Sequence, residues 1–315
     1  MRGSGIRLGR AAALLACALV LASCQPGQPA AEPPASGTPP GTVVVASFNF
    51  PESELLAAIY GLAVQHAGIP VRLELNLGPR ELVQPALEQG LVDLVPEYLG
   101  TALTSLDPAQ ATPMSKPVAV RSALARALSR WQVRVLTPAA AQDQNAVVVT
   151  GSTARRLRLH TVSDLRRVAG GLILGGPPEC PGRPYCLPGL RSAYGLRFAR
   201  FLPFDTEQQR VIALQDGVVN VAVLFSTDGN LASGGLVMLA DDRHLQPAEN
   251  VVPVIRADVI TRYGQRASSA VDAVSARLTS AQLTFLNWRV QVDGKDVLAE
   301  ARGWLQRQGI LPRTG

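Results

Sequence analysis

The chain contains one short pattern twice, and this repeat restricts the possible folds more than any other feature of the sequence. In the first copy, residues 86–93, a helical stretch ends at a glycine and a strand-like apolar run follows. The second copy, residues 213–220, has the same layout. An aromatic residue lies eight positions after the glycine in each copy, Tyr98 in the first and Phe225 in the second. The repeat therefore predicts two similar halves, each built from helices and strands.

Short apolar runs alternate with helical patterns on both sides of this repeat. We expect strands at 43–47, 70–75, 91–95, 171–174, 200–203, 218–224 and 236–239. We expect helices at 51–67, 80–89, 163–168, 187–194 and 205–215, and a helical pattern from 257 to 308. Such alternation predicts an α/β fold with largely parallel sheets.

The two aromatic residues lie at or just past the carboxyl ends of their strands. Ligands of open α/β sheets bind beyond these ends, so two facing lobes would place Tyr98 and Phe225 across one cleft. Thr101 follows Tyr98 by three positions, and Asp228 follows Phe225 by the same interval. The alternative interpretation is that helix–glycine–strand units are common and the repeat arises by chance.

The amino-terminal segment has the pattern of an export signal. Residues 11–22 are apolar and follow three arginines. Twelve helical residues span about 18 Å, against roughly 30 Å for a bilayer core, so residues 1–23 indicate a signal peptide rather than a membrane span. The sequence Leu-Ala-Ser before Cys24 resembles a bacterial lipobox, in which Cys24 would carry the lipid. The alternative is an ordinary signal peptide with an incidental cysteine.

Residues 24–41 are rich in Pro, Gly and Ala and predict a spacer after the lipidated cysteine, partly in polyproline II conformation. Lipid chains on Cys24 would hold the folded part at the outer face of the cytoplasmic membrane, in the cell envelope.

Two cysteines lie in the predicted folded part, Cys180 and Cys186. Five intervening residues make a poor zinc spacing without other ligands nearby. In an oxidising compartment this pair favours a local disulfide that stiffens a Pro/Gly-rich loop. The alternative is two free, buried thiols.

Charge and motif content argue against nucleic-acid binding and against catalysis. The formal net charge is +6, but removing the three leader arginines leaves 27 basic residues against 24 acidic ones, with no basic stripe. The chain has three widely separated histidines, no phosphate-binding loop and no nucleophile elbow. The pair Asp241 and Asp242 favours a turn or a helix cap over acid–base work. We therefore expect no enzyme activity, no catalytic residue, no metal and no cofactor.

Five segments together resemble a known receptor family. They are VVVASFNFPESELLAAIYG, LNLGPRELVQPALEQGLVDLVPEYLGTAL, YGLRF, LFSTDG and LADDR. They are similar to the ProX-like, OpuAC-type substrate-binding proteins of osmoprotectant ABC importers, which bind glycine betaine, choline or carnitine, and the similarity runs from about 42 to 312. It implies a type II periplasmic-binding-protein fold with two α/β lobes around a ligand cleft, joined by two hinge crossings near 147–150 and 251–254. The lobes would be 42–147 with 253–313, and 149–251.

The resemblance also implies a binding site made of aromatic rings and a few polar groups. Tyr98 matches an aromatic position of the family's box, and Thr101 matches a polar contact. Phe225 stands where the family often has Tyr. Arg183 matches a carboxylate-binding arginine, which the Cys loop would aim at the cleft. Asp228 would orient the loop that carries it, with direct ligand contact as the alternative.

Three positions depart from the family pattern. Asn145 and Ala248 stand where aromatic residues are usual, and Phe48 stands where Lys or Gln is common. Either Phe48 rebuilds the aromatic cage, or the ligand differs from glycine betaine. Tyr185, in the Cys loop, could also reach the cleft.

These observations predict a lipid-anchored extracytoplasmic receptor of an ABC import system. It would bind a small quaternary-ammonium or zwitterionic solute between its lobes and deliver it to a membrane permease driven by an ATPase, with no nucleic-acid partner. The alternatives are a receptor of the same fold for an amino acid or an aromatic compound, a lipid-anchored enzyme, and a sensor or adhesion module outside transport.

Overall fold

The computed structural model describes residues 41–110 and 116–313, and the described residues fall within one compact unit. The signal peptide 1–23, Cys24 and nearly all of the spacer 24–41 lie outside the described residues. Their assignments remain predictions. Within the described ranges, no helix combines the length and the apolar character that crossing a membrane would need.

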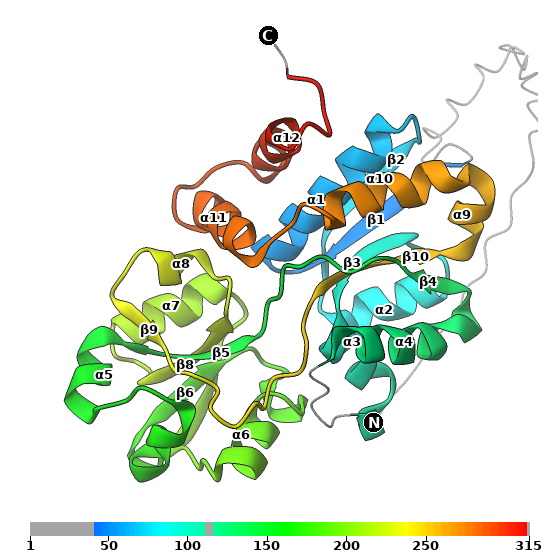
Figure 1. Ribbon diagram of the computed structural model, residues 1–315. Helices are drawn as coiled ribbons and strands as arrows, with labels where there is room; N and C mark the ends of the chain where they lie inside the picture. Colours follow the sequence, from blue (N-terminus) through cyan, green and yellow to red (C-terminus); the bar gives the residue numbers. More distant parts are fainter. Residues whose placement is uncertain (1–40, 111–115, 314–315) are drawn as a thin grey trace, which may run out of the picture. The chain divides into compact units, whose positions relative to one another are not determined.

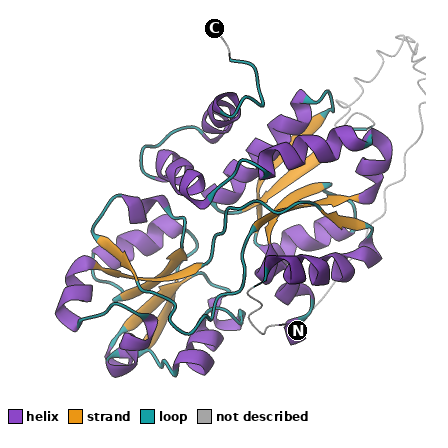
Figure 2. Cartoon of the chain, viewed as in Figure 1, coloured by secondary structure: helices purple, strands orange, loops and turns teal. Residues whose placement is uncertain are grey.

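The described chain builds two five-stranded sheets, each covered by helices (Figures 1 and 2). The first sheet has the order β2-β1-β3-β10-β4, and we call the part built on it the first lobe. Strand β1 pairs parallel to β2 and β3, whereas β10 pairs antiparallel to β3 and β4. Its strands are β1 (Val43–Phe48), β2 (Val71–Gly78), β3 (Leu94–Tyr98), β4 (Val133–Val135) and β10 (Val251–Arg256).

The helices of the first lobe come from both ends of the chain. Helix α1 starts at Pro51, whose fixed φ suits the first helical turn, and ends at His66 before Gly68, which has φ 77°. Twelve of its residues are buried because α1 lies between β1 and β2 on one side and α10 and α12 on the other. The other helices are α2 (Arg80–Glu88), α3 (Leu99–Leu106), α4 (Pro117–Leu128), α9 (Ala257–Tyr263), α10 (Gln265–Ser275), α11 (Ser280–Gln291) and α12 (Val297–Arg307).

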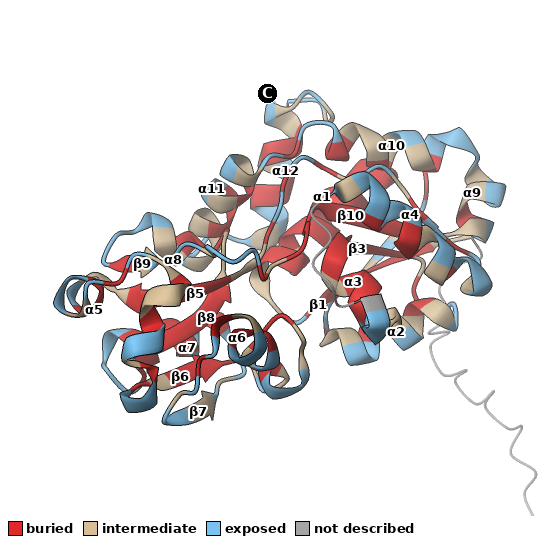
Figure 3. Cartoon of the chain, turned by 60° about the horizontal axis from the view of Figure 1, so that its bottom comes forward, coloured by how far each residue is buried: buried red, intermediate tan, exposed pale blue. Residues whose placement is uncertain are grey.

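The second sheet has the order β7-β6-β8-β5-β9, and we call the part built on it the second lobe. Side chains alternate along β5, so Val147 and Val149 join one core cluster while Ala146 and Val148 join another. Both faces of this sheet are therefore buried (Figure 3). Its elements are β5 (Asn145–Thr150), α5 (Gly151–Leu157), β6 (Ile173–Gly176), α6 (Leu187–Tyr194), β7 (Arg200–Pro203), α7 (Glu207–Gln215), β8 (Val221–Phe225), α8 (Gly229–Ala232) and β9 (Leu236–Met238).

The two segments that connect the sheets lie earlier in the sequence than expected. The two passages occupy 136–144 and 239–250, whereas we expected crossings near 147–150 and 251–254. Those residues lie inside β5 and β10, whose backbone groups pair with neighbouring strands of the second and first sheets respectively. An apolar run cannot show on which sheet it will pair, because that depends on partners far away in the sequence.

Most expected helices and strands are present. The segment expected to be helical at 163–168 is instead a 3₁₀ segment, Val162–Arg167. Strand β8 begins at Val221 rather than at 218 and includes Phe225 at its end. Helices α3, α4, α5 and α8 and strands β4, β5 and β10 were not anticipated. The disulfide between Cys180 and Cys186 is confirmed, with Cα atoms 5.2 Å apart, and it closes the turn before α6.

Helix α11 packs closely on α8 of the second lobe at Gly229 (Figure 1). A Cβ atom on Gly229 would lie 2.4 Å from the backbone N and Cα of Trp288 in α11. Gln291 at the end of α11 accepts the Gly229 N–H at 2.7 Å and donates to Glu207 Oε2 at 2.8 Å. The absence of a side chain at residue 229 therefore allows this contact between the two helices.

We expect Gly229→Ala to lower the free energy of unfolding by roughly 1–3 kcal/mol, because the new methyl group meets backbone that cannot turn aside. Urea denaturation measures this. Gly170→Ala is the matched control, since nothing lies within 4 Å of its added Cβ, and its effect should stay within about 0.5 kcal/mol. Equal effects of the two substitutions would contradict the close packing at Gly229.

Candidate functional site

Four aromatic rings from both lobes meet where the strands of the two sheets end. Phe50 has its ring centroid 5.2 Å from that of Phe225 and 6.2 Å from that of Tyr98. Phe48 stacks behind Phe50 at 6.0 Å. We call these four residues the ring cluster. The two rings singled out in the sequence, Tyr98 and Phe225, are thus brought together across the lobes by their shared contact with Phe50.

Phe50 is the member of the cluster that the sequence analysis missed. It lies two residues past the end of β1 and directly precedes α1. Tyr98 ends β3 and Phe225 ends β8, so all three rings lie at the carboxyl ends of strands. The rule that selected Tyr98 and Phe225 could also have selected Phe50.

The rings of Phe50 and Phe225 lie too close together to hold a ligand between them. A cation held by an aromatic face lies within about 6 Å of the ring centroid. Between Phe50 and Phe225 the whole separation is 5.2 Å, so these two rings are in van der Waals contact. A quaternary ammonium group could enter between them only if the two rings move apart.

Tyr98 is anchored by a buried carboxyl group. Its hydroxyl donates to Glu52 Oε1 at 2.6 Å, and Glu52 is only 2% exposed. Burial and the neighbouring Glu52 raise the pKa of Tyr98 well above its usual value. Burial also raises the pKa of Glu52, against the hydrogen bonds that it accepts. Tyr98 therefore remains a neutral ring with its hydroxyl in use.

Thr101 lies in the first turn of α3 beside an ion pair. Its hydroxyl accepts from Arg80, whose guanidinium also binds Glu97 through two hydrogen bonds of 2.8 and 3.2 Å. The same guanidinium lies 5.0 Å from the centroid of the Phe48 ring. The Thr101 N–H donates to Glu249 at 2.9 Å. Arg80 thus links Thr101 to the ring cluster through Phe48.

Arg183 contacts a carboxylate of the first lobe. Its guanidinium lies 3.2 Å from both oxygens of Glu81 in α2. The disulfide loop that carries Arg183 also contacts the first lobe through Tyr185, whose hydroxyl lies 3.0 Å from Thr104 Oγ1. In this arrangement Arg183 bridges the lobes at their rim, and a ligand carboxylate would have to compete with Glu81 for it.

Asn145 and Asp228 both adjoin Phe225, the first across the β5–β8 pair and the second through its N–H, which donates to Phe225 O at 3.1 Å. Asn145 is opposite Phe225 in the β5–β8 register, and its amide donates to Tyr185 O and Gln246 Oε1. It also lines a second-lobe cavity of about 130 Å³. Asp228 is 1% exposed and caps α8 by accepting the Asn230 N–H at 2.8 Å. Asp228 thus shapes the turn after Phe225.

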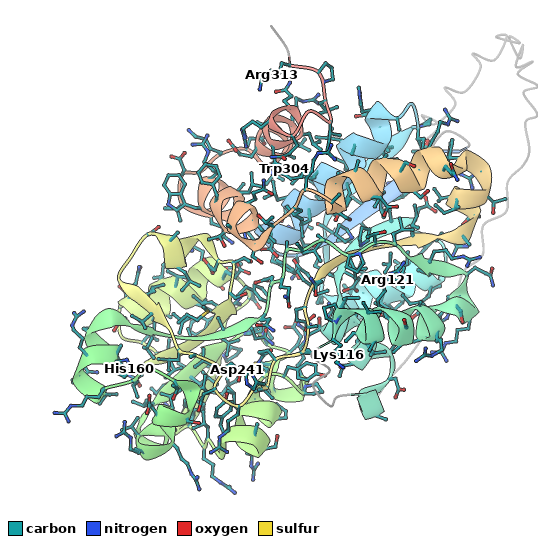
Figure 4. All side chains as sticks on the ribbon, viewed as in Figure 1. Lys116, Arg121, His160, Asp241, Trp304 and Arg313 are labelled. Atoms are coloured by element: carbon teal, nitrogen blue, oxygen red, sulfur yellow. A yellow bond between two sulfur atoms is a disulfide. The ribbon has the colours of Figure 1, made fainter. Side chains whose placement is uncertain are left out.

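The residues Asp241 and Ala248 lie on the passage from β9 to β10. Asp241, labelled in Figure 4, accepts the N–H groups of Leu245 and Gln246 and the hydroxyl of Tyr194. It therefore holds a turn. Ala248 is 5% exposed and belongs to the first-lobe core. In residues 41–110 and 116–313, no three His, Cys, Asp or Glu side chains gather as metal ligands would.

Comparison with known proteins agrees with this architecture. A family model described as the substrate binding domain of ABC-type glycine betaine transport system, OpuAC, matches residues 41–307. The chain belongs to the OpuAC family. As a member, it is a substrate-binding protein of an ABC transport system rather than an enzyme, and such proteins act outside the cytoplasm.

Relatives of this OpuAC-family chain are similar over most of their length. It is 28% identical over 268 residues to the glycine betaine-binding protein YehZ of Escherichia coli K12, covering 82% of this chain and 88% of YehZ. It is 28% identical over 290 residues to a glycine-betaine-binding protein of Pseudomonas aeruginosa, covering 86% and 89%. The carnitine transport binding protein OpuCC of Listeria monocytogenes is 23% identical over 304 residues, covering 95% of each chain.

Solved structures of the family show the same fold. A glycine betaine/carnitine/choline ABC transporter structure has a TM-score of 0.69 at 23% identity, covering 85% of this chain and 99% of that one. Lactococcal OpuAC, in a closed conformation with glycine betaine, has a TM-score of 0.61 at 15% identity, covering 85% and 96%. These similarities confirm the type II periplasmic-binding-protein fold.

Proposed function

We propose that this protein is the receptor of an ABC importer for a small quaternary-ammonium osmoprotectant such as glycine betaine, choline or carnitine. The observation that carries the proposal is the contact of Phe50 with both Tyr98 and Phe225, which assembles rings from two lobes at one point. The names of the relatives, which refer to glycine betaine and carnitine, support the same class of solute.

The chemistry of the ring cluster suits such a solute. A trimethylammonium group has no N–H to donate, so aromatic faces are its natural partners, each contributing roughly 0.5–2 kcal/mol depending on desolvation. Phe48, Tyr98, Thr101, Asn145, Arg183, Phe225 and Asp228 are the ligand-site residues that we propose from the sequence, and Phe50 is added from the structure. Phe48 and Asp228 would act behind the rings, because Phe48 backs Phe50 and Asp228 caps the turn after Phe225.

Delivery to a membrane permease completes the proposed role. The two lobes, which the sequence places at 42–147 with 253–313 and at 149–251, would move about the passages 136–144 and 239–250, with all of β5 in the second lobe and all of β10 in the first. A ligand can close them only through contacts that exist in the closed form and not in the open one. Lipid on Cys24 and the spacer to residue 41 would keep the receptor at the membrane surface.

Isothermal titration calorimetry with a panel of solutes tests the proposal. We expect saturable binding, one solute per chain, of at least one among glycine betaine, choline and carnitine. Amino acids and aromatic compounds are the comparison set. Binding of a comparison compound, with no heat from any quaternary-ammonium compound, would assign the receptor to another solute class.

A further inference from the structure

One buried carboxyl group joins both lobes and a C-terminal helix at a single point. Glu52 lies in the first turn of α1 and accepts hydrogen bonds from Tyr98, Thr227 and Asn287, and the carboxyl group of Asp143 interacts with it as well. Tyr98 donates to one carboxyl oxygen. Thr227 of the second lobe and Asn287 of α11 donate to the other. All five residues are at most 6% exposed, so water does not compete strongly for these contacts.

The contact with Thr227 places a second-lobe turn against the first lobe. Thr227 is two residues after Phe225 and directly precedes the helix cap Asp228. The backbone oxygen of Thr227 accepts from the Asn287 side chain at 2.9 Å, so α11 contacts the Thr227 backbone directly. The side chains of Thr227 and Asn287 also donate to the same oxygen of Glu52. Any displacement of Thr227 from Glu52 would therefore carry the Phe225 ring away from Phe50.

A second carboxyl group of the passage between the sheets holds the same turn. Asp143 accepts the Thr227 N–H at 3.0 Å and the Ser226 hydroxyl at 3.1 Å. Asp143 lies on the connecting segment 136–144, whereas Glu52 lies on the body of the first lobe. Asp143 also interacts with Glu52, so both carboxyl groups hold this turn against the first lobe. Opening must therefore break the Glu52–Thr227 contact, together with the contacts of Arg183 and Tyr185 at the rim.

We propose that Glu52 is a positioning residue, whose carboxyl group holds Tyr98 and Thr227 together and so assembles the ring cluster when the lobes close. This role rests on the proposed function in so far as the ring cluster is the ligand site. The link between the lobes itself can be tested without any ligand.

Hydrogen–deuterium exchange of the ligand-free full chain provides this test, read at the segment 225–230. Glu52→Met keeps the length of the side chain and removes its acceptors, and should raise exchange there about tenfold, as expected for losing a buried hydrogen bond. Glu52→Gln retains an acceptor and should restore most of the protection. Glu54→Met is the matched control on the same helix, since Glu54 is only half-buried, and should leave this segment unchanged.

Substitutions at the other end of the contact separate hydrogen bonding from packing. Thr227→Val keeps the shape and removes the hydroxyl, whereas Thr227→Ser keeps the hydroxyl and removes a methyl group. The positioning role requires fast exchange in the Val variant and slow exchange in the Ser variant. Exchange equal to wild type in both Glu52→Met and Thr227→Val, or equal acceleration by Val and Ser, would overturn it.

Ligand titration of the same variants keeps the two proposals apart. If wild type binds glycine betaine, choline or carnitine, Glu52→Met should weaken the affinity about tenfold or more. If wild type binds none of them while Glu52→Met still speeds exchange at 225–230, the proposed solute class fails and the link through Glu52 stands. If wild type binds and exchange is unchanged, the link fails and the solute class stands.

Discussion

Tyr98→Ala should weaken ligand binding by roughly 1–3 kcal/mol, a loss of about 5- to 150-fold in affinity. The substitution removes an aromatic face from the ring cluster. It also removes the hydroxyl that donates to Glu52 at 2.6 Å and leaves that buried carboxyl with one donor fewer. Calorimetric titration with the solute that wild type binds measures the effect.

Two further variants make this result specific. Tyr263→Ala, at a half-buried tyrosine of α9 that contacts Gly41, should leave the affinity unchanged. Tyr98→Phe keeps the ring and removes only the hydroxyl, so it should lie between wild type and Tyr98→Ala. Wild-type affinity in Tyr98→Ala would remove this ring from the binding site.

The free energy of unfolding should fall as the pH rises from about 4.5 to about 8, because several buried carboxyl groups, Glu207 among them, have raised pKa values. Burial, followed by the nearby Asp228, raises the pKa of Glu207 to about 8 from 4.5, while Arg210 opposes the shift. Glu207 is 5% exposed, and its Oε1 has no hydrogen-bond partner. The folded protein therefore keeps this proton over a pH range in which the unfolded chain has released it.

The direction of this change in stability with pH follows from proton linkage. Stability decreases with pH wherever the folded state binds more protons than the unfolded state, and it levels off above the folded-state pKa. For Glu207 alone the loss amounts to roughly 5 kcal/mol between the two pKa values. Urea denaturation between pH 5 and pH 9 measures it.

Glu207→Gln is the matched variant because it cannot titrate and keeps an amide near Gln291. Its stability should fall less steeply over the same pH range. Burial also raises the pKa of Glu249, to about 8, and the pKa values of Glu52, Asp143 and Asp228, and these groups contribute in the same direction and remain in this variant. Identical slopes for wild type and Glu207→Gln would show that Glu207 ionises normally in the folded protein.

Local sequence patterns were sufficient to predict an α/β fold and two members of the ring cluster. The expectation of largely parallel sheets was wrong, because β10 in the first sheet and β5 in the second pair antiparallel with both of their neighbours. Period-two and period-3.6 apolar runs depend on neighbours within a few residues, and glycines mark where helices end. Tyr98 and Phe225 could be found because the carboxyl ends of strands in α/β sheets form one edge. The Cys180–Cys186 disulfide was predictable because its partners are close in sequence.

Only the tertiary structure decided which side chains complete the site and which are already occupied. Phe50 lies between Tyr98 and Phe225, and Arg183 pairs with Glu81, 102 residues away in sequence. Hydrogen bonds and ring contacts depend on distances of a few ångströms between segments that the topology brings together, and no local pattern encodes these distances. The sequence alone thus determined the two α/β halves and the rings at their strand ends, whereas packing between the halves determined how those rings meet.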